Sequence, residues 1–418
     1  MLALVLSLLI SAPRAPEPDT VRVSAPVADS LGGSGLVPPA RPGAAARPVR
    51  VYPRFDVGAL YASPYGFGLG GGVLVKGLGR GGTRTTVDAR LSQYLQSAEV
   101  SFATRNPDRA RPYGWAGARA STETRRPYYG VGPFTEREDR LYLDIASASA
   151  EARAGVYPTG SRALYVQPSA RLVFDRLRGL APDEERTLAD LDPESRRAVR
   201  AVEGVDRTGA SVGLAVGSDL RDNDRYPRRG VAAHVEARRF RALDDSELGF
   251  TRYAGSASAF APVGALTLSA RADLAVTRQD EGDALPFYYL PTLDDRLLAP
   301  YPRGRLRGRD LLVVGLGARL PVVDVLGLYG IDATALGTLG NAYEDVFAQF
   351  EARVARADDL PAAGRAPLRP TLGLGVNVVD RIRPAVLIGA LVGFSPEGSV
   401  VTTFRLAYDL RDLAPLYR

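Results

Sequence analysis

Apolar and polar residues alternate along most of this chain, in stretches separated by short polar connections. In one stretch, residues 266–277, every second residue is apolar and those between are mostly polar or charged. The stretches 231–238 and 400–410 repeat the pattern. Because successive side chains of a β-strand point to opposite faces, this alternation predicts strands with one apolar and one polar face. A soluble β-sandwich shows the same alternation, so the number and length of the stretches must decide.

Sixteen segments have the length and pattern of such strands. A strand that crosses a bilayer needs roughly 9 to 11 residues, and closure into a barrel satisfies the backbone groups that lipid cannot hydrogen-bond. We therefore predict an all-β protein, a sixteen-stranded antiparallel transmembrane β-barrel of the outer membrane. The predicted strands are 51–62, 66–78, 83–93, 95–105, 112–124, 139–154, 162–178, 207–220, 230–242, 248–260, 264–278, 309–321, 325–338, 368–379, 383–394 and 399–411.

The even number of strands predicts which connections lie outside the cell, because it returns both chain ends to the periplasmic side. The connections 179–206 and 278–308 are then extracellular. Within the first of them, residues 182–202 have the spacing of a short amphipathic helix. Residues 343–357 also have helical spacing, and we place this connection on the periplasmic side.

The sequence predicts three parts. Residues 1–15 begin with an apolar run and end in small residues, which favours a signal peptide, although the usual basic residues before the run are absent. A short buried strand is the alternative for this segment. Residues 16–50 are rich in Pro, Ala, Gly and Ser, which predicts a disordered periplasmic linker. Residues 51–418 form the barrel, so the N-terminus is expected in the periplasm.

Composition excludes several classes of protein. The 418 residues include 24% charged residues and no run of eighteen apolar ones, so a helical membrane protein is excluded. No cysteine and one histidine leave no disulfide, thiolate metal site or His-rich metal cluster. The formal net charge of +6 is carried by arginines spread along the chain, because Lys76 is the only lysine. Without a basic cluster interleaved with aromatics, nucleic-acid binding is not expected.

Three groups of residues could suggest ligand or catalytic sites, but a structural explanation is favoured for each. The glycines of residues 66–72 do not open a helix, so they predict close packing against a plug or loop in the lumen rather than a phosphate site. Acidic residues at 280–283 and 294–295 fit no calcium-loop spacing. His234 has Ser211 as its one candidate partner, which does not make a catalytic triad. We expect no catalytic residue, metal or cofactor, and no enzyme activity.

A turn at residues 218–230 has a distinctive order of residues, Ser-Asp-Leu-Arg-Asp-Asn-Asp-Arg-Tyr-Pro-Arg-Arg-Gly. Asp and Asn favour a tight turn, proline ends strand pairing, and glycine permits a positive φ. The order resembles the periplasmic turn of the bacterial surface antigen family, whose barrel is shared by BamA and TamA. Residues 127–132 and 301–321 resemble two further elements of that family, the second being the end of its long sixth extracellular loop. The matching turn residues are Asp219, Arg221, Asp222, Asn223, Pro227 and Gly230.

The resemblance also implies a contact between the sixth loop and the barrel wall. In the family, an arginine at the loop tip contacts an aspartate and a glutamate of the wall. Here the corresponding tip, residues 299–301, has no arginine, and the glutamate position falls at Gly317. Asp332 matches the family aspartate and is predicted to point into the lumen, where a carboxylate needs a cation nearby.

We predict that Arg305 or Arg307 supplies that cation in place of the missing tip arginine. In a second register, Leu306-Arg307-Gly308 itself forms the loop tip, and the two alternatives stay open. The predicted loop and wall residues are Arg305, Arg307, Gly308, Arg319 and Asp332.

The resemblance implies a function in helping polypeptides to insert into, or cross, the outer membrane. The implied means are a weakly paired seam between the first and last strands and a loop in the lumen. The chain has no room for the POTRA domains of the insertases, so a passive pore, a structural barrel or an anchor are the alternatives. The expected partners are outer-membrane lipids, with client outer-membrane proteins or a separately encoded periplasmic partner.

Overall fold

The structure is a computed structural model that divides into two units, Met1–Ala46 and Arg47–Arg418. All described residues belong to the second unit. The predicted signal peptide and nearly all of the predicted linker lie outside them, so both stay predictions. The described residues are 50–58, 68–76, 83–104, 112–135, 140–182, 184–191, 193–223, 226–280, 285–293, 301, 304–355, 364–382, 385–397 and 400–406.

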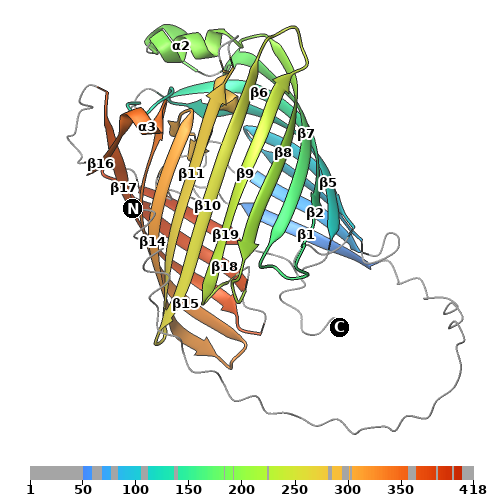
Figure 1. Cartoon of the computed structure of the whole chain (residues 1–418), viewed down its shortest axis with the longest axis vertical. Helices are drawn as coiled ribbons and strands as arrows, with labels where there is room; N and C mark the ends of the chain where they lie inside the picture. Colours follow the sequence, from blue (N-terminus) through green and yellow to red (C-terminus); the bar gives the residue numbers. More distant parts are fainter. Residues whose placement is uncertain are drawn as a thin grey trace, which may run out of the picture. The chain divides into compact units, whose positions relative to one another are not determined.

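The second unit is built on a large antiparallel sheet (Figure 1). Every strand range predicted from the sequence overlaps an observed strand, and each strand of the main ladder pairs with the next along the chain. The prediction of an all-β antiparallel protein is thus confirmed. The ladder consists of β1 (Arg50–Gly58), β2 (Gly68–Lys76), β3 (Arg84–Ser92), β4 (Leu95–Ala103), β5 (Tyr113–Tyr128), β6 (Leu141–Gly155), β7 (Tyr165–Leu180), β8 (Asp206–Asp219), β9 (Gly230–Ala242), β10 (Gly249–Val263), β11 (Leu266–Gln279), β14 (Asp310–Val325), β15 (Tyr329–Tyr343), β17 (Ala366–Asp380), β18 (Ala385–Phe394) and β19 (Val400–Leu406).

Three short strands that the sequence pattern did not predict lie in the connections. β12 (Thr292–Leu293) and β13 (Leu306–Arg307) form a two-stranded sheet of their own. β16 (Phe350–Val354) pairs parallel with β17. Period-two alternation cannot reveal such short elements, because two to five residues give too few positions for a pattern.

Helices are few and short. The 3₁₀ turn η1 (Leu188–Asp190) and the helix α2 (Pro193–Arg200) lie within the segment predicted to be helical. The other helical elements are the 3₁₀ turn η2 (Phe287–Tyr289) and the helix α3 (Val346–Gln349). Among the described residues, no helix is both long enough and apolar enough to cross a membrane.

The two faces of the sheet differ as the alternation predicts. Val235 in β9 is 63% exposed and Leu316 in β14 is 69% exposed, so apolar side chains cover the outer face. On the inner face, His234 and Glu236 of β9 and Arg271 of β11 line cavities. An exposed apolar face opposite a polar face is the arrangement of a sheet whose outer surface lies in lipid.

The connection after β15 lies at the same end of the sheet as the connection before β14. The Asp310 carboxylate, at the start of β14, accepts hydrogen bonds from the backbone N–H of Thr277 (3.0 Å) and of Val346 in α3 (3.0 Å). The connections before β14 and after β15 are therefore at one end, so the prediction that put 278–308 outside the cell and 343–357 in the periplasm was wrong in separating them. The reason is topological, because two successive strand crossings return the chain to the same end. We name this the loop end, and the opposite end, with the β8–β9 connection, the turn end.

An apolar core fills the loop end next to α2, which Figure 1 shows above the sheet. The Phe287 and Tyr128 ring centroids are 4.7 Å apart, and those of Phe240 and Phe250 also 4.7 Å. Leu191 and Val199, from the η1–α2 segment, are buried in the same cluster. The connections at this end are thus folded inward over the sheet.

The close packing predicted for the glycines of residues 66–72 can be checked at Gly72. A Cβ at Gly72 would clash with the carbonyl oxygen of Val87 and the carboxylate of Asp88, both on β3. At Gly72 the close packing is therefore against the neighbouring strand, and packing of the other glycines against a plug or loop stays a prediction. Residues 66 and 67 lie outside the described residues.

Candidate functional site

Arg305 connects the loop before β14 to two distant parts of the sheet. Its guanidinium donates to Thr135 Oγ1 (2.6 Å) and to the Thr135 carbonyl oxygen (2.6 Å), just after β5. It also forms an ion pair with Glu397, between β18 and β19, at 3.2 Å. Because the side chain is only 1% exposed, these partners replace the water that the guanidinium loses on burial.

Arg307 is buried against aromatic rings in the same region. Its guanidinium carbon lies 5.1 Å from the Phe287 ring centroid and 5.7 Å from that of Tyr128. Its carbonyl oxygen accepts a 2.7 Å hydrogen bond from the Gly132 N–H. Stacking of a cation on aromatic faces stabilises a buried guanidinium. We call Thr135, Phe287, Arg305, Arg307 and Glu397 the loop cluster.

Gly308 lets the loop pass close to the end of β15. A Cβ at this position would clash with the backbone of Tyr343. The sequence predicted Gly308 as part of a loop tip, and the structure shows it as the point where the loop meets the wall. Asp310 follows two residues later and, fully buried, anchors both α3 and the end of β11.

Asp332 binds a different cation from the two proposed. Its carboxylate forms an ion pair with Arg381 at 2.6 Å and accepts a hydrogen bond from the Tyr226 hydroxyl. The prediction that Arg305 or Arg307 pairs with Asp332 is therefore wrong. Asp332 lies near the turn end of β15, whereas Arg307 lies beside Tyr343 and the loop end. Eleven residues of strand, roughly 36 Å at about 3.3 Å per residue, separate the two levels.

The turn motif folds as its residue types predict. The Asp222 carboxylate accepts hydrogen bonds from the N–H groups of Asn223 (2.9 Å) and Arg228 (3.0 Å). Asp219 forms an ion pair with Arg221 at 2.9 Å. Gly230 has φ +103°, and a Cβ there would clash with the Leu220 carbonyl. Aspartate, asparagine and glycine thus have separate structural roles in this turn.

The turn and the wall residues, predicted as separate groups, meet at one place. The Arg319 guanidinium stacks 3.5 Å from the Tyr226 ring centroid and donates a 2.5 Å hydrogen bond to the Pro227 carbonyl. Tyr226 in turn bonds to Asp332. We call Tyr226, Pro227, Arg319, Asp332 and Arg381 the turn cluster. It holds the β8–β9 connection against the inner face of β14 and β15.

Tyr226 is the central residue of the turn cluster and was not singled out from the sequence. Burial, and next the hydrogen bond to the Asp332 carboxylate, raise the pKa of the Tyr226 hydroxyl above its ordinary value of 10.0. The hydroxyl therefore stays protonated and remains a donor. Its position inside the turn motif was a usable signal. No sequence pattern singled out Arg381, which follows the end of β17.

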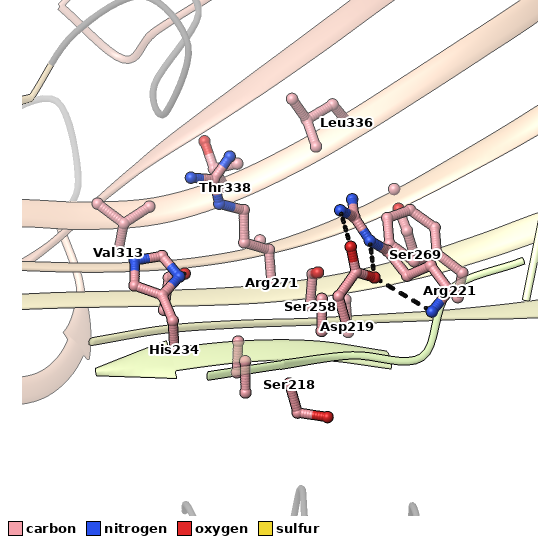
Figure 2. A pocket seen from close by; sticks show the side chains of 18 of the residues that line it. Ser218, Asp219, Arg221, His234, Ser258, Ser269, Arg271, Val313, Leu336 and Thr338 are labelled. Carbon is pink, nitrogen blue, oxygen red and sulfur yellow. Dashed lines mark hydrogen bonds and ion pairs between the residues drawn. The ribbon is translucent and has the colours of Figure 1, made fainter. Parts of the chain in front are cut away.

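Two polar cavities lie along the inner face of the sheet. The first, of about 440 Å³, is lined by residues from β7 to β15 and has the Asp219–Arg221 pair on its wall (Figure 2). His234 and Arg271 line the same cavity. The second, of about 420 Å³, lies under η2 and is rich in arginine. Its lining includes Arg119, Arg126, Arg171, Arg238 and Arg252, with Glu123, Asp175 and Glu236.

His234 is part of the polar wall. Its Nδ1 lies 2.9 Å from Ser256 Oγ, whereas Ser211 lines the second cavity, so the two residues considered together from the sequence are not partners. Within the described ranges, no cluster of three or more His, Cys, Asp or Glu side chains could hold a metal ion. The acidic run 281–283 and residues 294–295 lie outside those ranges.

Solved structures resemble this sheet, although no protein-family model and no curated protein matches the sequence. The first is the crystal structure of BamA from Haemophilus ducreyi lacking POTRA domains 1–3, with a TM-score of 0.59 and 11% identity over 85% of this chain and 69% of that one. This chain shares the barrel fold of BamA. CdiB from Escherichia coli matches 85% of this chain with a TM-score of 0.51 and 10% identity, and this chain spans 61% of it.

The BamA-like fold agrees with the resemblance that the turn motif and the strand pattern indicated. At 10 to 11% identity the similarity is one of fold. The two sheets therefore share their fold although few of their aligned residues are identical. In this chain, the alternation of apolar and polar side chains is what a two-faced sheet requires.

Proposed function

We propose that this chain is an integral protein of the bacterial outer membrane that assists the insertion or translocation of polypeptides. In this proposal β1 to β19 form a closed sixteen-stranded barrel with the turn end and the N-terminus in the periplasm. The BamA-like fold and the exposed apolar outer face support the location. Lipids of the outer membrane cover that face, and client outer-membrane proteins or a separately encoded periplasmic protein are the partners.

The observation that carries the proposal is the relation between the first and last strands. β1 and β19 approach each other, yet no ladder of hydrogen bonds joins their described residues. Every other pair of neighbouring strands in the main ladder is paired. The described part of β19 has 7 residues and β1 to β4 have 9 each, against 16 in β14 and 15 in β15. Among the described residues, the sheet is thus least paired at this seam, which lies on the side with the short strands.

Such a seam can act on another polypeptide without any chemical step. Unpaired backbone N–H and C=O groups form a template on which an incoming strand can pair. Short strands at the seam reduce the apolar height of the protein there, and a bilayer thins to match it. Both effects lower the barrier to inserting a client strand, which supports an insertase and requires no catalytic residue.

The interior favours a route through the seam over a route through the lumen. The loop cluster folds inward at the loop end, and the turn cluster holds the β8–β9 connection across the turn end. A passive pore is the second candidate, because the two polar cavities of about 440 and 420 Å³ lie between these clusters. Single-channel conductance separates the two candidates, since an insertase with both clusters in place should conduct poorly.

The test is the rate at which an unfolded outer-membrane protein inserts into liposomes that contain, or lack, the purified protein. Because the chain has no cysteine, a disulfide across the seam can be added without interference. Thr402→Cys in β19 is combined with cysteine at position 51, 53, 55 or 57 of β1, and the pair that oxidises best is used. We expect acceleration by the reduced protein and loss of acceleration after oxidation.

The control disulfide joins Val51→Cys to Val75→Cys, which face each other in the β1–β2 ladder. It restrains β1 equally but leaves the seam free, so acceleration should survive its oxidation. Equal rates with and without the folded protein would reject the insertase and leave the pore or anchor.

A further inference from the structure

The last residues of β14 extend beyond its neighbour on one side. The ladder between β11 and β14 ends at the pair Thr267–Arg319, whereas the ladder between β14 and β15 continues to Val325–Tyr329. Residues 320–325 therefore have a strand partner on the β15 side and none among the described residues on the other. Figure 1 shows the β14–β15 hairpin at the turn end.

Part of this open edge can accept hydrogen bonds from another strand and donate to it. Pro321 has no N–H, and a bulge separates Pro321 from Val323 in the ladder with β15. The usable edge is therefore Val322–Val325. At about 3.3 Å per residue it is roughly 13 Å long, enough for a short strand.

Three of the four side chains along the edge, those of Val322, Val323 and Val325, are apolar, and side chains on both faces are exposed. Val322 is 60% exposed, and Leu326, at the tip of the hairpin, is 89% exposed. The charged residue in this stretch, Asp324, already lies 3.8 Å from Arg381. Soluble sheets usually protect an edge with charged side chains or cover it, because an open apolar edge pairs with other chains.

The loop end shows how the same protein covers a comparable edge. Residues 366–368 of β17 extend beyond the ladder with β15, and β16 pairs with them. Lipid cannot replace β16 at the turn end, because hydrocarbon does not hydrogen-bond the backbone groups of an open edge. An extended polypeptide satisfies both the backbone groups and the apolar side chains.

We propose that the edge Val322–Val325 binds an extended, uncharged apolar segment of another polypeptide by strand addition. At the turn end, which faces the periplasm in the proposed function, that segment is a strand of a client protein before it reaches the seam. The identity of the client rests on the proposed function, whereas binding of a strand to this edge does not.

The test measures binding of a fluorescent eight-residue peptide of alternating valine and threonine, with a lysine at each end, to the full chain in detergent micelles. We expect saturable binding that is lost when alternate peptide nitrogens are methylated, because methylation removes the backbone donors but keeps the side chains. Val322→Pro or Val323→Pro should weaken binding at least about tenfold, because proline removes a ladder hydrogen bond. Weakened binding by either one of the two variants is enough, since only alternate residues direct their N–H to the open side.

Leu326→Lys at the hairpin tip and Leu243→Lys at the loop end are the matched controls, since both residues are exposed and outside the edge. Both should bind the peptide like the unsubstituted protein. Equal binding of the methylated peptide would overturn strand addition. A second result would also overturn it. If no peptide binds, and brominated lipid quenches the fluorescence of a Leu326→Trp variant in liposomes, the hairpin lies in the bilayer. Peptide binding without acceleration of insertion would reject the role of a client protein but would support strand binding at Val322–Val325.

Discussion

The two ends of the sheet differ in how far their strand edges are paired and in how deeply their charged side chains are buried. At the loop end, β16 covers the edge of β17, and Arg305 is buried between Thr135 and Glu397. At the turn end, one connection is held by Tyr226 and Arg319, while Val322–Val325 remains open. The loop end is therefore built for stability and closure. The turn end combines a smaller polar contact with a surface on which another chain can pair.

The largest expected difference concerns Arg305. Arg305→Ala removes the nearer of two donors to the Thr135 carbonyl oxygen, leaving Arg369 at 3.5 Å, and leaves Glu397 with one cation fewer. We therefore expect the free energy of unfolding to fall by about 3 kcal/mol. Urea unfolding in micelles, followed by the fluorescence of Trp115, measures it. Arg353→Ala, which removes an exposed ion pair with Glu351 at the same end, should cost no more than about 0.5 kcal/mol. Similar losses for both would contradict a special role for the loop cluster.

Close packing at the loop end gives the second effect. Gly308→Ala places a Cβ against the backbone of Tyr343, and we expect a loss of about 2 kcal/mol from overpacking. Gly337→Ala in β15 is the control, because no atom lies within 4 Å of a Cβ there. The unfolding midpoints of the two variants provide the comparison. If Gly308→Ala is as stable as Gly337→Ala, the loop does not meet the wall at this residue.

A double-mutant cycle tests whether the two clusters are separate. Asp332→Ala and Tyr226→Phe remove the two partners of one hydrogen bond, so their losses should be non-additive by about 1 kcal/mol. Asp332→Ala and Arg307→Ala lie at opposite ends, and their losses should add. Non-additivity of the second pair would restore the contact that the family resemblance implied.

The smallest expected effect is a pH dependence at the turn end. Because the folded state raises the pKa of Tyr226 above 10.0, the hydroxyl contributes stability that is present below that pH and is lost as the pH rises above it. The stability difference between the unsubstituted protein and Tyr226→Phe should therefore shrink above pH 10. Unfolding midpoints at pH 8 and pH 11 measure it. A constant difference would show that the hydroxyl does not donate to Asp332.

Local patterns predicted the sheet well because alternation is a local property. β9 begins and ends where the pattern of 230–242 placed it, and the inner side of the pattern carries His234 and Glu236. The β14–β15 hairpin was less well placed. β14 continues to Val325, four residues beyond its pattern, because Val322 and Val323 are both apolar and break the alternation. β15 therefore begins at Tyr329 instead of 325, and it continues to Tyr343.

Contacts across the interior could not be predicted in the same way. The motif comparison predicted that Asp332 points into the lumen and that Arg305 or Arg307 is its partner. The partner was wrong, because sequence similarity does not report the level of a residue along its strand. The true partner of Asp332 is Arg381. Arg305 pairs with Glu397. Both partners lie in turns that the sequence left without a role. β16 was too short to show a period.

The Arg305 contact also orders events in time. Its partners Thr135 and Glu397 lie 170 and 92 residues away in the chain, so this contact is among the long-range closures that form late in folding. Glu397 sits in the final hairpin. While that hairpin is missing, Arg305 has lost one of its anchors and the loop is less firmly held over the interior. The loop is thus fully anchored only after the last strands have formed. In a chain that lacks them, the loop end of the interior should stay more open.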